Sequence, residues 1–254
     1  MRIHLSSSIA NFHSKLRAKF PFKKLRWYHI FSPGLFVGLY HIGDYLRFLF
    51  HLGNKQVIWC GTDILNLEQT IFSSLIAKTP AYHICENKVE QQLLSQLGIQ
   101  AEIRPFLFDD ASKFTPCFKP SSTPHVFLTA HPGREGEYGI PIIRKIAPLL
   151  PDIRFHIYGI DGQNTENIMY HGLVSEDQFN DEIRHYQSCL RLNTFDGFGE
   201  GVAKSLLLAQ YPITAISYPL VAYAPTAKDL IIHLKRLKYK DKPNPAYKYW
   251  SQVL

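Results

Sequence analysis

Short apolar runs alternate with stretches of helical period along most of this chain. The runs are rich in β-branched and aromatic residues, which favours buried strands. We expect strands at Trp27–Phe31, Gln56–Cys60, Ala81–Cys85, Ala101–Phe108, His125–Thr129, Arg154–Tyr158, Ile168–Val174 and Pro212–Ser217. Between these runs, apolar residues recur with a helical period, which predicts helices at Asp44–Leu52, Leu65–Ile76, Val89–Leu97, Ile140–Leu150, Glu176–Tyr186 and Thr226–Leu237. This alternation predicts an α/β fold with parallel sheets covered by helices.

A proline-rich break divides this pattern into two halves. Asp109–Pro124 contains three prolines and several Ser, Thr and Lys residues without any period, which is typical of a linker. We therefore expect two Rossmann-like domains, residues 1–118 and 119–254, facing each other across a cleft. In such sheets ligands bind at the carboxyl ends of the strands. We expect Tyr247–Leu254 to form a C-terminal helix that crosses back to the first domain.

The segment Leu190–Ile213 predicts a ligand-binding turn in the second half. It reads as a short strand, a glycine-rich turn carrying Asp196, a helix, and a proline-marked entry into another strand. Free N–H groups and the dipole at a helix N-terminus favour phosphate. Glycine spacing alone also fits an ordinary strand-to-helix turn, because many such turns need a positive φ.

Composition narrows the class of protein. Hydrophobic residues make up 46% of the chain and charged residues 19%, which is typical of a globular protein. The four cysteines have no CxxC spacing, so we expect reduced thiols in a cytoplasmic protein and neither a zinc site nor a disulfide scaffold. The N-terminus has no signal-peptide pattern, and Phe31–Leu52 is too interrupted by polar residues to be a transmembrane helix.

The basic balance of the chain favours anionic partners. It has 28 Lys and Arg against 21 Asp and Glu, a net charge of +7. Lys15–Trp27 interleaves basic with aromatic or apolar residues, so it could lie on an anionic membrane at the inner face. The same pattern fits nucleic-acid binding, which we rank lower, and it fits a solvated helix face with snorkelling lysines equally well.

Four pieces of the second half occur in an order that resembles a known family. They are His131–Gly139, Phe155–Gly159, Tyr170–Val174 and Arg191–Ile213. Together they resemble the donor-binding domain of GT-B glycosyltransferases, in particular retaining enzymes of the family 4 type. The first half is similar more loosely, through Trp59–Asp63 and Ala81–Ile103.

The resemblance implies a hexosyltransferase that moves a sugar from a nucleotide-phosphate donor to a hydroxyl acceptor in glycan or glycolipid assembly. It implies a retaining, metal-independent reaction with no cofactor, the nucleotide sugar being a substrate. The implied donor-binding residues are Gly133, Arg134, Gly159, Val174, Asn193, Gly197, Phe198, Gly199, Glu200 and Lys204. The implied catalytic residues are Asp196 and Asp63, and the acceptor side is Gly61 and Thr62.

Several of these residues also have structural interpretations. Arg134 either binds the donor phosphates through two guanidinium nitrogens or pairs with a neighbouring glutamate in its own loop. Asp63 either acts on the acceptor hydroxyl or caps the helix that begins near Leu65. Glu200 either accepts hydrogen bonds from the donor or stabilises the start of a helix.

Lys204 departs from the family pattern. The family has a glutamate there that accepts hydrogen bonds from the donor ribose, whereas lysine has donors only. Near a phosphate, however, an ammonium would be favourable. Two alternatives therefore stay open: a non-catalytic GT-B-like subunit that binds a nucleotide or glycan, and a transferase that uses a lipid-phosphate sugar.

Overall fold

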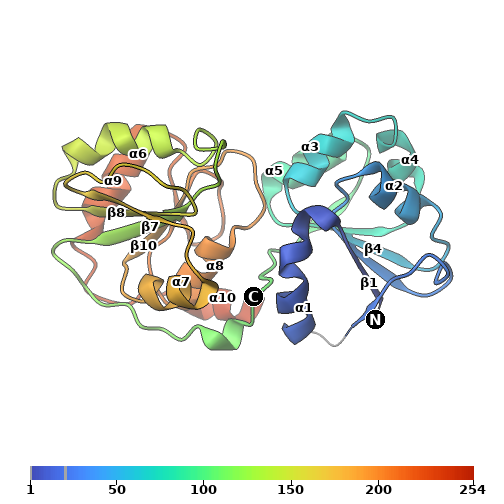
Figure 1. Ribbon diagram of the computed structural model, residues 1–254, viewed down its shortest axis with the longest axis horizontal. Coiled ribbons are helices and arrows are strands. Elements are labelled where there is room, and N and C mark those ends of the chain that lie inside the picture. Colours follow the sequence, from blue (N-terminus) through green and yellow to red (C-terminus); the bar gives the residue numbers. More distant parts are fainter. Residues whose placement is uncertain (1, 20–21) are drawn as a thin grey trace. The chain divides into compact units, whose positions relative to one another are not determined.

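The computed structural model describes residues 2–19 and 22–254, and their contacts divide them into two units (Figure 1). Unit 1 comprises the chain up to Asp110 together with Phe195–Phe198. Unit 2 comprises Ala111–Thr194 and Gly199–Leu254. The chain thus passes between the units at the start of the proline-rich segment, and part of the glycine-rich turn packs with unit 1.

Unit 1 contains a parallel sheet with the strand order β2-β1-β3-β4-β5-β6. Its strands are β1 (Arg2–Leu5), β2 (Lys23–Lys24), β3 (Gly34–Val37), β4 (Lys55–Ile58), β5 (Tyr82–Cys85) and β6 (Ala101–Ile103). The strand predicted at Trp27–Phe31 is wrong, because that stretch forms turns and its large side chains are exposed. The strand lies instead at Gly34–Val37, which is fully buried.

Helices cover both faces of this sheet. They are η1 (Ser7–Phe12), α1 (His13–Lys19), α2 (Ile42–Leu49), α3 (Thr62–Glu68), α4 (Ser73–Lys78) and α5 (Lys88–Gln96). Successive strand residues point to opposite faces, so Phe36 packs with α2 to α5 while Leu35 and Val37 pack with η1 and α1. One helix was expected at Leu65–Ile76, but the structure has α3 and α4 in its place.

Unit 2 repeats the architecture with the strand order β12-β11-β10-β7-β8-β9. Its strands are β7 (His125–Thr129), β8 (Arg154–Tyr158), β9 (Ile168–Gly172), β10 (Ser188–Arg191), β11 (Ile213–Thr214) and β12 (Ala222–Tyr223). Its helices are η2 (Ala111–Lys113), α6 (Ile140–Ile146), η3 (Ala147–Leu149), α7 (Glu176–Ile183), α8 (Glu200–Leu207), α9 (Ala227–Leu237) and α10 (Tyr247–Val253). The predictions for β7 and β8 are confirmed residue for residue.

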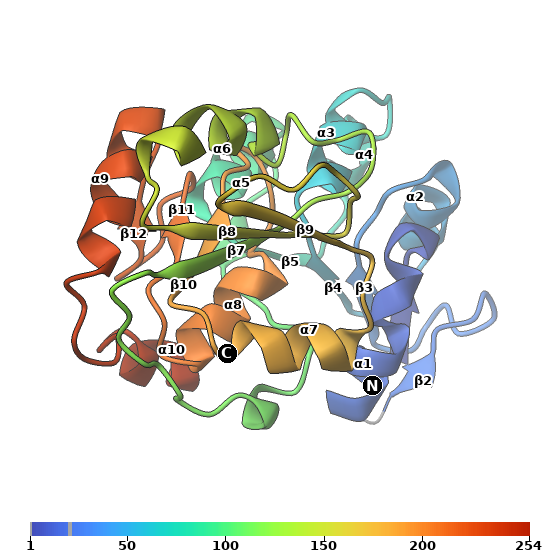
Figure 2. The same cartoon turned by 60° about the vertical axis from the view of Figure 1, so that its left-hand side comes forward.

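The helices of unit 2 also lie on both faces of its sheet. Helices α6 and α9 cover one face, and α7 and α8 cover the other (Figures 1 and 2). The C-terminal helix α10 packs against α8 within the same unit, where Trp250 Nε1 donates to the Pro219 carbonyl at 3.1 Å. Two parallel sheets, each covered by helices, confirm the predicted α/β class.

Two kinds of feature are absent from the described residues, a membrane-spanning helix and a cluster of metal ligands. In residues 2–19 and 22–254, no helix combines the length and apolar character needed to cross a membrane. The same part of the chain brings together no group of three or more His, Cys, Asp or Glu side chains that could hold a metal ion. The four cysteines are free thiols.

Candidate functional site

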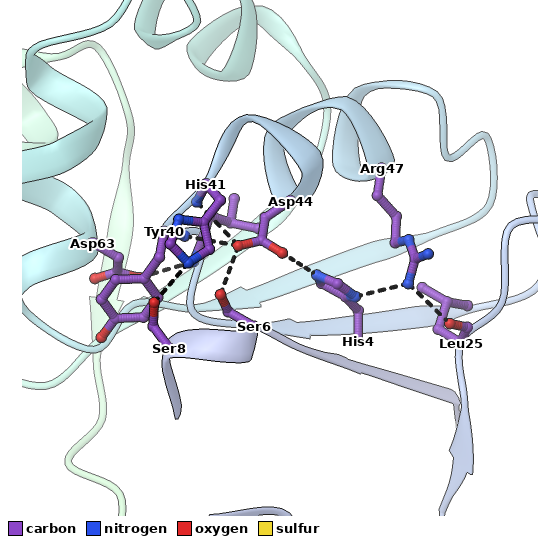
Figure 3. Close-up of polar contacts among 10 residues, drawn as sticks. His4, Ser6, Ser8, Leu25, Tyr40, His41, Asp44, Arg47 and Asp63 are labelled. Carbon is purple, nitrogen blue, oxygen red and sulfur yellow. Dashed lines mark hydrogen bonds and ion pairs between the residues drawn. The ribbon is translucent and has the colours of Figure 1, made fainter. Parts of the chain in front are cut away.

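The carboxyl edge of the unit 1 sheet carries a buried polar network around Asp44 (Figure 3). Asp44 accepts hydrogen bonds from His4 Nε2 at 2.7 Å and from Ser6 Oγ at 2.6 Å. It also accepts the backbone N–H groups of Tyr40 and His41, each at 3.1 Å. Burial opposes ionisation of Asp44, but these hydrogen bonds outweigh it and lower its pKa. Asp44 therefore fixes the loops that follow β1 and β3 as an ionised carboxylate.

His4 links this network to a cation. Arg47 Nη1 lies 3.1 Å from His4 Nδ1, and a guanidinium can only donate (Figure 3). The other ring nitrogen, Nε2, therefore carries the proton that His4 donates to Asp44.

Ser8 and His41 form a second, exposed pair at the same edge, with Ser8 Oγ 2.8 Å from His41 Nε2. The Asp44 carboxylate bonds the backbone N–H of His41 rather than its ring. Within residues 2–19 and 22–254, no carboxylate orients this pair as in a nucleophilic triad.

Asp63 is a buried link between strands rather than an exposed acid. Its side chain is 0% exposed, and its oxygens accept the N–H groups of Leu39 at 3.2 Å and Cys60 at 3.0 Å. Burial raises the pKa of Asp63 to about 7. The catalytic role expected for Asp63 therefore has no exposed carboxylate to act through. Asp63 is also not the N-cap of a helix beginning near Leu65, because it lies in the first turn of α3, whose N-cap is Gly61.

The acceptor-side turn and part of the glycine-rich turn meet within unit 1. Gly61 has a φ of +93°, and a Cβ on it would lie 2.7 Å from the Gly197 nitrogen. Thr62 begins α3 directly after Gly61. Asp196, half-buried, accepts the N–H of Gly197 on its Oδ1 at 2.9 Å.

Glu86 and Asn87, which follow β5, hold this turn in place and were not singled out from the sequence. Glu86 Oε2 accepts the Phe198 N–H at 2.9 Å. Asn87 Nδ2 donates to the Asp196 carbonyl at 2.7 Å while its Oδ1 caps α5. The only local signal was a polar pair after a strand, because the partners lie more than 100 residues away.

A second buried glutamate lies beneath Glu86. Glu90 is 0% exposed and accepts the Glu86 N–H on Oε2 at 2.6 Å, while its Oε1 has no hydrogen-bond partner in the described part of the chain. Burial, and then the carboxylate of Glu86, raise the pKa of Glu90 well above its usual range. Glu90 is therefore a neutral acid under conditions in which an exposed glutamate is ionised.

Glu90→Gln is expected to make the stability of the protein less dependent on pH. The folded-state pKa exceeds the ordinary value of 4.5, so the free energy of unfolding falls as the pH rises from 4.5 towards the folded-state pKa. Each fully linked proton contributes a slope of about 1.4 kcal/mol per pH unit. Urea unfolding between about pH 5 and about pH 8 should give a shallower decline for this variant. Glu102→Gln, at an exposed glutamate paired with Arg104, is the control, and equal slopes for all three proteins would contradict the expectation.

In unit 2 the expected donor-binding residues follow four adjacent strands. Arg134 lies in the loop after β7, Gly159 follows β8, Val174 follows β9 and Asn193 follows β10. Because β10, β7, β8 and β9 are neighbours in a parallel sheet, their carboxyl ends share one edge. Asn193 is 4% exposed, and its Oδ1 has no hydrogen-bond partner among the described residues.

Arg134 is oriented by its own loop. Its Nε and Nη2 atoms both contact Glu137 Oε2, at 3.0 and 2.5 Å, and its side chain is 43% exposed. Gly133, with a φ of +77°, donates its N–H to Glu135. The pairing with a neighbouring glutamate is thus present, and the guanidinium also lies 5.7 Å from the centroid of the Tyr138 ring.

Lys204 is buried between α7 and α8 in unit 2. Its side chain is 2% exposed, and its Nζ donates to Asn180 Oδ1 at 2.9 Å and lies 3.4 Å from Glu176 Oε1. The rings of Phe114 and Phe179 lie 5.3 and 5.6 Å from the ammonium. The phosphate-binding role expected for Lys204 does not follow from this position, since the ammonium contacts protein groups in the interior of the unit.

The remaining residues of the predicted donor turn surround the start of α8. Gly199 is the N-cap of α8 with a φ of −58°, and a Cβ on it would lie 3.1 Å from Arg191 Nε. Glu200, half-buried, occupies the first turn of the helix.

A row of histidines lies beneath α7. His156 Nε2 is 2.8 Å from His125 Nδ1, and His156 Nδ1 is 2.9 Å from His171 Nε2. Tyr186 stacks on His156, with ring centroids 4.3 Å apart. Burial, and then the neighbouring histidines, lower the pKa of His156 to about 3. The row thus joins the sheet to α7, where His171 Nδ1 lies 3.6 Å from Glu182 Oε2.

Comparison with known proteins supports the fold. No family model and no curated protein matches the sequence. The structure is similar to a sucrose-phosphate synthase from Thermosynechococcus elongatus (TM-score 0.64, 11% identity, 95% of this chain and 72% of that chain). It is also similar to Anabaena HepE in complex with UDP and glucose, with a TM-score of 0.63 and 12% identity over 86% of this chain and 73% of that chain. A third similar structure is the pneumococcal O-GlcNAc transferase GtfA in complex with UDP and GlcNAc, with a TM-score of 0.57 and 12% identity over 87% of this chain and 53% of that chain.

The chain spans about half the length of GtfA and nearly three quarters of the other two. At these identities the likeness concerns the fold and not the activity. The two parallel sheets with their helices thus have the α/β architecture of GT-B glycosyltransferase structures.

Proposed function

We propose that this protein is a glycosyltransferase that moves a sugar from a nucleotide-phosphate donor to a hydroxyl acceptor. The observation that carries the proposal is the alignment of Arg134, Gly159, Val174 and Asn193 at the carboxyl ends of four adjacent strands. This is the edge at which open α/β sheets bind ligands. Two of the similar structures, HepE and GtfA, were solved with UDP, which supports a nucleotide donor.

Arg134 is assigned to the donor diphosphate. Its guanidinium is oriented by Glu137 and half-exposed, so it can stabilise negative charge that develops on the leaving phosphate. The N-terminus of α8, which begins after Gly199, adds the positive end of a helix dipole. This positive charge supports a reaction that needs no metal and no further cofactor.

Asp196 is assigned to the donor sugar. Its carboxylate lies in a turn whose backbone Glu86 and Asn87 bind directly, so the side chain has little freedom to move away. Asp63 and Lys204 are assigned as positioning residues, because both are buried and bonded to protein groups. Retention of the anomeric configuration, a glycan or lipid-linked acceptor and a role in glycan or glycolipid assembly complete the proposal.

One observation favours a second candidate, a non-catalytic subunit that binds a nucleotide or glycan. Lys204 replaces the glutamate that the family pattern has in the donor turn, and a lysine side chain has hydrogen-bond donors only. A transferase that uses a lipid-phosphate sugar would also dispense with a ribose acceptor.

A thermal-shift screen against nucleoside diphosphates and nucleotide sugars tests the proposal. A ligand at 100 times its Kd should raise the free energy of unfolding by about 2.7 kcal/mol. Binding by the wild type that is lost in Asn193→Leu supports a donor site at the unit 2 edge. Failure of every nucleotide to raise the melting temperature would refute a nucleotide donor.

A further inference from the structure

The entire excess of positive charge lies in the first part of the chain. Residues 1–43 contain seven of the 28 Lys and Arg residues and none of the 21 Asp and Glu residues. The rest of the chain is therefore formally neutral. A local charge of this size attracts anions to one region rather than to the whole surface.

The described part of this region forms a basic pocket in unit 1. The pocket has a volume of about 660 Å³, and its charged lining consists of Arg2, Arg17, Lys23, Lys24 and Arg26. Two histidines and two aromatic residues complete the lining, and none of the lining residues is acidic. Phe20 and Pro21, which belong to the predicted membrane-binding stretch Lys15–Trp27, lie outside the described residues.

His29 contacts two of the arginines that line this pocket. Arg2 Nη1 lies 3.5 Å from His29 Nδ1, which also accepts the Arg26 N–H at 3.0 Å. Desolvation, and then the charges of Arg2 and Arg26, lower the pKa of His29. The charges of Arg2 and Arg26 thus create a positive potential beside His29, which is favourable for an anion in the adjacent pocket.

Large apolar side chains of the β2–β3 loop, which contributes Tyr28 to the pocket, and of the adjoining α2–β4 loop are open to solvent. Their exposed fractions are 52% for Trp27, 71% for Tyr28, 74% for Phe31, 64% for Phe50 and 66% for Leu52. Clustered apolar residues of this size seldom lie in water without a partner. These five apolar residues and the five basic residues of the pocket together make up the docking face.

The docking face lies at the amino edge of the unit 1 sheet. The β2–β3 loop projects beyond the strands (Figure 2), and the α2–β4 loop is joined to it by hydrogen bonds from Leu52 N and Gly53 N to the Ile30 carbonyl, each 2.7 Å. Both loops precede a strand of the sheet. The Asp44 network and the Gly61 turn lie at the opposite, carboxyl edge of the same sheet.

We propose that the docking face binds the surface of a membrane that contains anionic phospholipid. Lipid phosphates occupy the basic pocket, while the side chains of Trp27, Tyr28, Phe31, Phe50 and Leu52 enter the interfacial region. Cations attract anionic headgroups, and aromatic residues favour the boundary between water and acyl chains. Neither of these two signals alone anchors a protein stably, but the docking face has both.

The apolar residues distinguish a membrane from a nucleic acid. A polyanion in solution needs the cations and can stack on flat rings, but it has no use for the exposed aliphatic side chain of Leu52 or for a group of rings on adjoining loops. Lys55 and Arg47 lie beneath this surface, bonded to backbone carbonyls and to the ring of Trp27. The rigid support of the loops fits insertion at an interface.

Vesicle flotation of the full chain tests this proposal. Phosphatidylcholine vesicles are compared with phosphatidylcholine vesicles that contain phosphatidylglycerol. The wild type should float only with the latter, and less so in high salt. The variant Arg17→Gln/Lys23→Gln/Lys24→Gln removes three exposed charges. Because each basic residue near an anionic surface contributes a factor of about 5, partitioning should weaken on the order of 100-fold.

A second variant and a control isolate the docking face. Tyr28→Ser/Phe31→Ser keeps all the charges and should weaken partitioning by roughly 10-fold for each ring. Lys145→Gln/Lys228→Gln/Lys248→Gln removes three exposed lysines of unit 2 and should leave flotation unchanged. Equal flotation of the wild type and both docking-face variants would overturn the proposal. Binding to RNA or heparin without binding to phosphatidylglycerol vesicles would overturn it as well.

Discussion

Replacing Arg134 with alanine is expected to lower kcat/KM for release of nucleotide from a sugar donor by at least about 100-fold. Loss of one preorganised group that stabilises developing charge typically lowers kcat 10²- to 10³-fold. Arg134 meets the condition for such a role, because Glu137 holds its guanidinium by two contacts while 43% of the side chain stays exposed. Initial rates across a range of donor concentrations measure the effect.

Arg144→Ala is the matched control for this variant. Arg144 is an exposed arginine of α6 in the same unit, and its Nε donates to the Tyr170 hydroxyl at 3.0 Å. Its removal should leave the rate nearly unchanged. If Arg134→Ala and Arg144→Ala were equally active, the assignment of Arg134 to the donor phosphates would be wrong.

Lys204→Glu is expected to destabilise the folded state by about 3–5 kcal/mol. The substitution places a buried carboxylate next to Glu176 and Asn180 and removes the ammonium that Phe114 and Phe179 enclose. An uncompensated buried charge has a cost of this size. Urea unfolding followed by circular dichroism measures the change.

Lys204→Met separates the charge from the packing. Methionine keeps much of the volume, and Glu176, whose side chain is 43% exposed, can turn to solvent. The loss should therefore stay within about 1 kcal/mol. A Lys204→Glu variant that is as stable as the wild type and binds nucleotides more tightly would show that residue 204 belongs to the donor site after all.

The strands were predictable where an apolar run is also buried. His125–Thr129 and Arg154–Tyr158 were predicted residue for residue, because neighbouring strands cover both sides of each. Trp27–Phe31 is similarly rich in aromatic and β-branched residues but lies in an exposed loop. Composition alone cannot distinguish such a loop from a buried strand. The strand at Gly34–Val37 was missed because Pro33 and Gly34 are typical of a turn.

The residues of the candidate site were predictable only where their place follows from the order of strands and turns along the chain. Gly159 and Asn193 follow predicted strands and Val174 ends one, so their place at the sheet edge could be inferred. The contacts of Asp63 with backbone N–H groups and those of Glu86 with the Phe198 turn join residues that are distant in sequence. Spacing carries no information about such partners, and the burial of Lys204 depends equally on the packing of α7 against α8.

The most direct test of the central claim follows the anomeric proton of each donor in a panel of nucleotide sugars by NMR, with hydroxyl acceptors present. The proposal predicts that the wild type consumes at least one donor and forms a product with the same anomeric configuration. Arg134→Ala and Asp196→Ala, both verified as folded, should form it at least about 100-fold more slowly. No turnover of any donor, or equal turnover by the wild type and both variants, would contradict the claim that this chain is a glycosyltransferase.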